Sequence, residues 1–300
     1  MKNKKAMTKT RRSDHRFNVI LTVIASVWLI IVAYPCIQIL SSSFSSGEAV
    51  SNGKVLLWPV APSLTGYEMV FKYKMVWVGY ANTLLYAGMG TLLHLFMTIC
   101  GAYPLSRRDF QIRGLGHKIL AVPMFFHGGM IPSYILASNL GLVDTRFLMI
   151  ISGAVGITHI IIMRTFFQSS IPQELLESAR IDGISDFGYL LRIVIPLSKA
   201  SLAVILLYAL VGKWNDFFSP MIYLRTREYY PLQLVVREIL NATKVDVSNV
   251  TDIEVAEKLA SAADLMKYSL IIVSTLPMLL LYPFLRKFFE KGVMIGSLKG

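Results

Sequence analysis

Two polar stretches between long apolar runs contain the residues that could bind a partner or handle charge. The first is the segment 171–200, which includes Glu177 and Asp182, and the second is Lys213 followed by Asp216. Carboxylates beside a helix turn offer polar contacts to a docked protein. A lysine three residues before an aspartate lies on the same helical face and can pair with it. These residues indicate protein binding or a charged site within an apolar region, and helices must position them.

The segment 171–200 predicts two short amphipathic helices joined by a tight turn, which we call the elbow. A capping box can start the first helix, and a glycine can end it because glycine accepts the left-handed backbone common at helix C-termini. A second cap can start the next helix, which a proline without a backbone N–H closes. Such an elbow could grip a soluble partner, although its caps alone also fit an ordinary connector. The signals are Ser170 with Gln173, Asp182-Gly183, Ser185 or Asp186, and Pro196.

The patterns of common enzyme sites do not occur in the sequence. The histidines are scattered, and none forms the i, i+4 pair with a neighbouring glutamate that a zinc protease helix needs. There is no Gly-x-x-x-x-Gly-Lys-Ser/Thr loop for ATP phosphates and no Gly-x-Ser-x-Gly nucleophile turn. We therefore expect no metal site, no cofactor bound by this chain and no enzyme activity. The histidines are His15, His94, His117, His127 and His159.

The surrounding sequence predicts an all-α polytopic membrane protein. The chain is 54% hydrophobic and only 16% charged, with a mean hydropathy of +0.56, which leaves little room for a soluble domain. A helix needs roughly 20 apolar residues to cross a bilayer, and the apolar runs predict about six such spans. The fourth is short, and charges interrupt the fifth. The predicted spans are 17–47, 75–106, 119–143, 147–163, 201–224 and 268–285.

Basic residues near the predicted spans indicate the orientation, because Lys and Arg are retained on the cytoplasmic side. Residues 1–16 carry seven basic residues and one acid, so this N-terminal segment is predicted to be cytoplasmic. The loops on the same side are also basic, whereas the outer loop 225–267 carries seven acids against six basic residues and is long enough to weaken the rule. We therefore expect a transmembrane domain over 17–290, a cytoplasmic elbow at 171–200 and a cytoplasmic tail at 291–300.

The net charge of +12 fits this topology better than nucleic-acid binding. Basic loops attract anionic lipid headgroups, and no basic stripe alternates with exposed aromatic residues as it does in nucleic-acid sites. The apolar stretch after the basic N-terminus is longer than that of a cleaved signal peptide, so we expect a retained anchor. Cys36 and Cys100 fall within predicted spans and imply no disulfide.

The elbow also contains a longer pattern, Glu177-x-Ala179-x-x-Asp182-Gly183, followed later by Ile195-Pro196. This pattern resembles the coupling loop of the membrane subunits of binding-protein-dependent ABC importers. It departs from the family at Ser178 and Ile184, where alanine is usual or common. Further stretches similar to the carbohydrate-importer branch are Asn82-Thr83, Ala102–Arg107, Ile131-Pro132, Leu140–Thr145 and Trp214–Phe217. Phe125–Gly129 and the Gly-Ser-Leu-Lys-Gly ending are similar to the oligosaccharide group often called lipoprotein-type permeases.

The resemblance implies a permease subunit of an ATP-driven importer for sugars, with oligosaccharides as the expected class, in a bacterial plasma membrane. The implied partners are a homologous second permease, two ATPase subunits that bind the ATP and Mg, and an extracytoplasmic solute-binding protein. Alternatives are an ABC permease for amino acids or polyamines and an ion-coupled secondary transporter, which should show inverted repeats or acidic relays. The residues implied to couple to the ATPase are Glu177, Ser178, Ala179, Asp182 and Gly183.

Two further sites follow from the resemblance. Lys213 and Asp216 could form an ion pair, or Trp214, Asn215 and Asp216 could border the translocation path, with the indole ring offering a face on which sugars stack. The glycine-rich tail cannot form a stable helix of its own. It resembles the tail of the shorter maltose-type permease and could insert between the ATPase subunits or remain a frayed end. The implied tail contacts are Gly296, Lys299 and Gly300.

Overall fold

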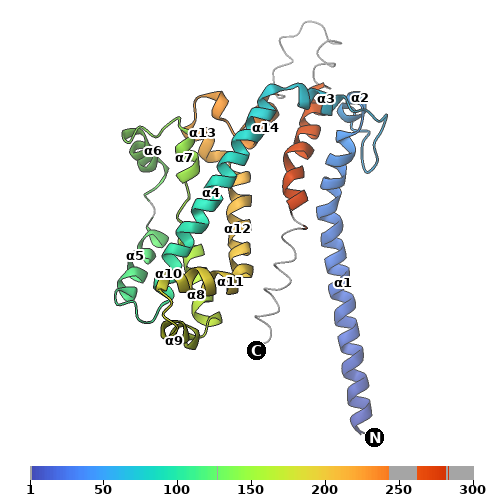
Figure 1. Cartoon of the computed structure of the whole chain (residues 1–300). Helices are drawn as coiled ribbons and strands as arrows, with labels where there is room; N and C mark the ends of the chain where they lie inside the picture. The colour runs from blue at the N-terminus through green and yellow to red at the C-terminus, as the bar shows by residue number, and fades with distance from the viewer. Residues whose placement is uncertain (1, 127, 243–261, 282, 284–300) are drawn as a thin grey trace. The chain divides into compact units, whose positions relative to one another are not determined.

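The computed structural model describes residues 2–126, 128–242, 262–281 and 283, with side chains from residue 17 onward. These residues form helices and loops, and none of them lies in a strand (Figure 1). The expectation of an all-α protein is therefore confirmed. The predicted tail, including Gly296, Lys299 and Gly300, lies outside the described residues. The chain divides into two compact units, one of residues 1–72 and 240–273 and the other of residues 73–239 and 274–300.

The first unit is organised around the C-terminal end of α1 (Lys2–Ser43). Serines between positions 41 and 45 are buried there and bond to the backbone: Ser41 Oγ donates to Leu57 O at 2.6 Å. The short helices α2 (Gly47–Ser51) and α3 (Thr65–Lys72) follow. By contrast, none of the residues in the most apolar stretch of α1 is buried against the described part of the chain.

The second unit is built on α4 (Lys74–Ser106), which packs against α7 (Arg146–Ile151), α8 (Ile157–Ser170) and α12 (Lys199–Trp214) (Figure 1). A cluster of buried apolar side chains from α4, α8 and α12 extends to the elbow. The remaining helices of the chain's central part are α5 (Arg113–Phe125), α6 (Met130–Asn139), α9 (Gln173–Ile181), α10 (Asp186–Tyr189), α11 (Ile195–Leu197), α13 (Phe218–Tyr223) and α14 (Leu232–Ala242). A π-helical turn, η1 (Leu190–Val194), lies between α10 and α11, and a 3₁₀ turn, η2 (Arg227–Tyr229), lies between α13 and α14.

Within the described residues, three helices are long and apolar enough to cross a membrane alone. They are Phe17–Ser43, Lys74–Ser106 and Ala262–Leu281, and they correspond to the first, second and last predicted spans. Two further pairs meet this criterion only together: α5 with α6, whose directions differ by 111°, and Asp186–Leu197 with α12, whose directions differ by 81°. The structure thus offers three to five candidate spans in place of six continuous ones.

The interruptions have local backbone causes. The third predicted span breaks before α6, where Gly129 adopts a φ of +84°. The fourth is divided between α7 and α8 near Gly153, whose φ is +69°. The fifth is divided between the end of α12 at Trp214 and the start of α13 at Phe218. Apolar composition gives the length of a candidate span but does not report such breaks. Broken backbone at membrane depth is tolerated where it is buried in protein or lines a cavity.

Candidate functional site

The first helix of the elbow, α9, begins directly after Pro172 and has no side-chain cap. The predicted cap by Ser170 is wrong, because Ser170 is the last residue of α8 and Pro172 occupies the cap position. The end of α9 follows the prediction. Gly183 has a φ of +73° and donates its N–H to Arg180 O at 3.1 Å, while Ile184 N–H donates to Ala179 O at 2.9 Å. This pair of bonds satisfies the last carbonyls of the helix and fixes the turn.

The second helix of the elbow begins as predicted, with Ser185 Oγ accepting the N–H of Gly188 at 3.2 Å. It does not close at Pro196, however, but continues through η1 and α11 to Leu197 and then bends into α12. Pro196 has no N–H to donate one turn back, and its ring crowds the carbonyl there. The wider π turn before it accommodates both effects, so the proline shapes the helix without ending it.

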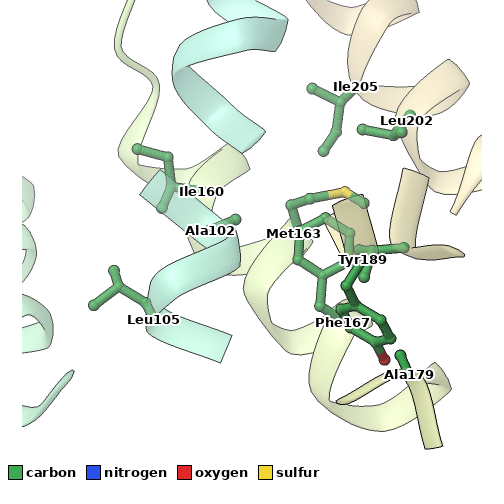
Figure 2. Close-up of a cluster of buried hydrophobic side chains, with 10 residues drawn as sticks. Ala102, Leu105, Ile160, Met163, Phe167, Ala179, Tyr189, Leu202 and Ile205 are labelled. Carbon is green, nitrogen blue, oxygen red and sulfur yellow. The ribbon is translucent and has the colours of Figure 1, made fainter. Parts of the chain in front are cut away.

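The predicted coupling residues divide between the surface and the core. Glu177, Ser178, Asp182 and Gly183 are exposed. Ala179 is only 3% exposed and belongs to the buried cluster that also contains Phe167 and Tyr189 (Figure 2). Its small side chain therefore lets α9 approach the chain's own core, while the other four residues lie on the outer surface of the elbow.

An exposed apolar residue near the turn was not singled out from the sequence. Ile181, the last residue of α9, is 88% exposed, and Phe187 of α10 is 69% exposed. Leu175, Leu191 and Leu197 of the elbow are exposed as well, at 38%, 48% and 56%, so apolar side chains accompany the polar groups on its surface. The exposure of Ile181 could have been suspected from the sequence, because this residue stands among the polar residues of the run 177–183.

Four charges tie the elbow to the loop after α4, and we call them the four-charge ring: Arg107, Asp109, Arg180 and Asp186. Arg107 donates to Asp109 through Nε at 2.9 Å and Nη2 at 2.6 Å, and to Asp186 through Nη1 at 2.6 Å. Arg180 Nη2 lies 2.5 Å from Asp109 Oδ2 and 3.9 Å from Asp186 Oδ1. Each aspartate therefore contacts both arginines, and the charges alternate in sign around the ring.

The electrostatics of the ring favour the charged forms of Asp109 and Arg107. Hydrogen bonds from Arg107, and then from Arg180, hold the pKa of Asp109 well below its usual range. The bonds to Asp109 and Asp186 likewise raise the pKa of Arg107. The Arg107 side chain is 10% exposed and also donates to Tyr103 Oη at 3.0 Å. Arg107 is therefore a nearly buried member of the ring.

A cavity of about 750 Å³ opens between the elbow, α8 and the loop after α4. Its walls include the ring arginines and the carboxylates of Glu174 and Glu177. Arg108, Arg113 and Arg164 also line it, and none of these three forms an ion pair within the described residues. This unit therefore presents a hollow lined by charged residues beside the elbow.

Lys213 and Asp216, both within the described residues, do not form the ion pair that was one of the two readings of the sequence. Lys213 Nζ donates to Met149 O at 2.8 Å and also to Ser152 O, at the end of α7. Asp216 Oδ1 accepts the N–H of Ser219 at 3.0 Å, near the start of α13. The lysine charge therefore meets backbone carbonyls at a helix C-terminus, where the helix dipole also favours a cation.

The predicted path residues have different surroundings. Trp214 is 3% exposed and its indole Nε1 donates to Ser274 O at 3.2 Å, whereas Asn215 is exposed. Asp216 and Lys213 line a cavity of about 240 Å³ with residues of α4, α12 and the loop after α7. Of the three predicted path residues, only Asp216 faces this cavity.

The sequence analysis did not identify a pair of histidines beside this cavity, His94 and His159. His94 Nε2 lies 2.7 Å from His159 Nδ1, and His94 Nδ1 lies 2.9 Å from Gly153 O. Because a carbonyl only accepts, Nδ1 of a neutral His94 carries the proton, which leaves Nε2 to accept from His159 Nδ1. Gly156 makes room for the pair, since a Cβ there would lie 2.5 Å from His94 Cε1.

The sequence and the fold of this chain are similar to those of known proteins. The chain belongs to the family of binding-protein-dependent transport system inner membrane components, whose model matches residues 90–295. It is thus a membrane protein of a transport system, and the resemblance predicted from the elbow is confirmed. All the elements of the elbow and both cavities fall within or directly beside the matched residues.

Two of the three similar proteins named below belong to carbohydrate transport systems. The chain is 35% identical over 270 residues to protein LplC of Bacillus subtilis (strain 168), covering 90% of both chains. It is 32% identical over 284 residues to the polygalacturonan/rhamnogalacturonan transport system permease protein YtcP of the same organism, covering 95% of this chain and 98% of the relative. A solved bacterial ABC transporter involved in the import of the acidic polysaccharide alginate contains a similar chain, with a TM-score of 0.83, 35% identity and coverage of 93% and 98%.

Proposed function

We propose that this chain is the membrane-spanning permease subunit of an ATP-driven importer for sugars, with oligosaccharides as the substrate class. It works beside a homologous second permease, two ATPase subunits and an extracytoplasmic binding protein in a bacterial plasma membrane. ATP and Mg are bound by the ATPase subunits. The relatives named above support the sugar class, and they favour it over amino acids, polyamines or an ion-coupled mechanism.

The elbow is the observation that carries this proposal. It is a short helix pair held on the chain's own buried cluster through Ala179 and Tyr189, so it can move only with the helices beneath it. Glu177, Ser178 and Asp182 give its outer surface polar groups, and Ile181 adds an apolar contact. An ATPase subunit that pushes on this surface would shift the membrane helices and exchange inward for outward access.

The cavity beside α12 is our candidate for a segment of the translocation path. Asp216 and Lys213 line it together with His94 and Tyr208, so hydrogen-bonding groups face the space that a sugar hydroxyl would enter. Trp214 supports the wall from inside through its bond to Ser274. We also propose that both termini are cytoplasmic and that Gly296, Lys299 and Gly300 of the tail contact the ATPase pair.

The test of the proposed function is Gly183→Asp in the complex with the second permease and the ATPase subunits. A Cβ at Gly183 meets no atom of this chain within 4 Å, so any obstruction would come from a docked partner. Gly53→Asp is the matched control, because Gly53 has a φ of +66° and equally open surroundings in the first unit. Both variants therefore carry the same backbone strain.

We expect Gly53→Asp to transport normally and Gly183→Asp to insert and fold but lose transport. The measurement is ATP-dependent uptake of labelled oligogalacturonate and of a neutral galacto-oligosaccharide into proteoliposomes, with ATP hydrolysis recorded in parallel. Normal uptake and normal substrate-stimulated hydrolysis by Gly183→Asp would contradict the assignment of the elbow as the ATPase contact.

A further inference from the structure

We propose that the four-charge ring delivers the movement of the elbow directly to α4. This inference rests on the proposed function, since it concerns the route by which ATPase motion reaches the membrane helices. Within the chain, the elbow continues covalently into α8 and α12, whereas α4 ends at Ser106 and α9 begins 67 positions later, at Gln173. Any direct action of the elbow on α4 must therefore pass through contacts in space.

The ring provides such a contact at the inner end of α4. Arg107 is the C-cap residue directly after α4, Asp109 follows in the loop, Arg180 is in α9 and Asp186 is the first residue of α10. Both helices of the elbow are thus joined to the same loop. A displacement of either helix changes the position of Asp109 or Arg107, because each charge has partners on both sides.

The geometry makes this link stiffer than an ordinary surface ion pair. Arg107 binds Asp109 with two parallel bonds and Asp186 with a third, and its planar guanidinium cannot follow one partner without moving against the other. Its side chain is 10% exposed, and the Tyr103 ring lies 5.7 Å from its guanidinium carbon. Exposed single pairs contribute little, but a bidentate arginine in a network holds a defined geometry.

The other parts of α4 explain what the movement would accomplish. This helix is 33 residues long and carries His94 into the wall of the cavity beside α12. Gly90 of α4 also touches the stem of Lys213, since a Cβ there would lie 3.0 Å from Lys213 Cε. A shift at the inner end of α4 would therefore alter the cavity wall that lies more than one helical turn away.

The main experiment uses Arg107→Gln, because this side chain is only 10% exposed and offers a docked partner little surface. Arg107→Lys keeps the charge, and Arg192→Gln on the same elbow is the matched control, since Arg192 is exposed and forms no ion pair within the described residues. All variants are made in a background without Cys36 and Cys100, with Ser152→Cys as a reporter at the cavity.

The readout is the rate at which a maleimide labels residue 152 in the assembled complex, with and without ATP and vanadate. We expect ATP to change this rate in the parent and in Arg192→Gln. In Arg107→Gln we expect the ratio of the rates with and without ATP to fall about tenfold, which is within the usual range of coupling energies. Arg107→Lys should recover part of it. ATPase association and hydrolysis should remain, which separates broken transmission from failed docking.

A second variant keeps the proposal testable if Arg107→Gln does not fold. Asp109→Cys with Arg180→Cys, made without Cys36, Cys100 or the reporter cysteine at 152, removes two charges of the ring, and a short bis-maleimide then restores the link covalently before ATP-dependent uptake is measured. Recovery of uptake after cross-linking supports the ring as the link, and no recovery overturns it. An unchanged ATP effect in Arg107→Gln also overturns it. If Gly183→Asp still uncouples the complex in that case, the proposed function stands and only the ring fails.

Discussion

Asp144 holds two loops of the second unit together, and its replacement gives a graded prediction. Its carboxylate accepts the N–H of Arg225 at 2.9 Å, the N–H of Thr226 at 2.9 Å and the Thr226 hydroxyl at 2.6 Å. Its own N–H donates to Tyr223 O at 2.8 Å. These bonds lower the pKa of Asp144, with the Thr226 hydroxyl as the largest cause. The residue also has a φ of +61°, which side chains rarely adopt.

The two structural features set different costs for different substitutions. Hydrogen bonds to a charged group contribute about 1.5–3 kcal/mol each when shielded, but the Arg225 bond is exposed and water can replace it. The two bonds to Thr226 are only partly buried, so we expect each to contribute about 1 kcal/mol and Asp144→Ala to lose about 2 kcal/mol from the pair. Alanine also retains the left-handed backbone, which costs about 1 kcal/mol more. The total is about 3 kcal/mol.

The other variants should be milder, for separate reasons. Asp144→Gly loses the same bonds but accepts the positive φ, so it should be about 1 kcal/mol less damaging than alanine. Asp144→Asn keeps an acceptor oxygen and tolerates the left-handed region, so it should lose about 1 kcal/mol. The expected order of stability is Asn above Gly above Ala.

Thermal unfolding of the purified protein in detergent, followed by intrinsic fluorescence, measures this order. Equal midpoints for Ala and Gly would refute the contribution of backbone strain, and an unchanged midpoint for Ala would refute the hydrogen-bond argument. The pH dependence gives a further check. Because the folded pKa is lowered, the stabilisation is present above the ordinary carboxyl pKa of about 3.9 and disappears as pH falls through the lower folded value. The advantage of the parent over Asp144→Asn should therefore shrink only in that acidic range.

Two glycine substitutions test close packing in the two units separately. Gly156→Ala should destabilise the second unit by about 1–3 kcal/mol, because the new Cβ would lie 2.5 Å from His94 Cε1, and His94→Ala in the same chain should relieve most of the clash in a thermal unfolding cycle. Gly66→Ala should cost a similar amount in the first unit, but Ser269→Ala should relieve it only partly, since the Cβ would also lie 2.8 Å from the backbone oxygen of Leu265. Full relief in the second case, or none in the first, would show that the neighbours move more freely than these distances imply.

The features that could be predicted from the sequence are those with local causes. The turn at Gly183 depends on residues within five positions of it, and both its left-handed backbone and the Ser185 cap appear as expected. The helical class follows equally directly from long apolar runs. The prediction that Ser170 caps a helix was wrong, because the sequence does not show that Ser170 is itself the last helical residue of α8.

The parts that could not be predicted depend on residues far apart in the chain. The bond from Arg107 to Asp186 spans 79 positions, and the bond between the histidines at 94 and 159 spans 65. No periodicity or spacing rule connects such residues. The interrupted spans are an intermediate case, because Gly129 and Gly153 are visible in the sequence but only the structure shows that they adopt a positive φ.

Polar contacts along α4 explain why this helix, among the described ones, is the best placed to carry movement. Helices in lipid gain little from apolar contact with each other, because lipid tails are as apolar as leucine. Near its N-terminal end Asn82 Nδ2 donates to Glu228 O at 2.8 Å, and Thr83 Oγ1 accepts the N–H of Leu232 at 2.8 Å. His94 bonds the loop after α7, and Arg107, directly after the C-terminal end of α4, binds the elbow. These directional bonds join each part of α4 to a particular neighbour, and under our proposal they are the route by which a force on the elbow would reach the cavity.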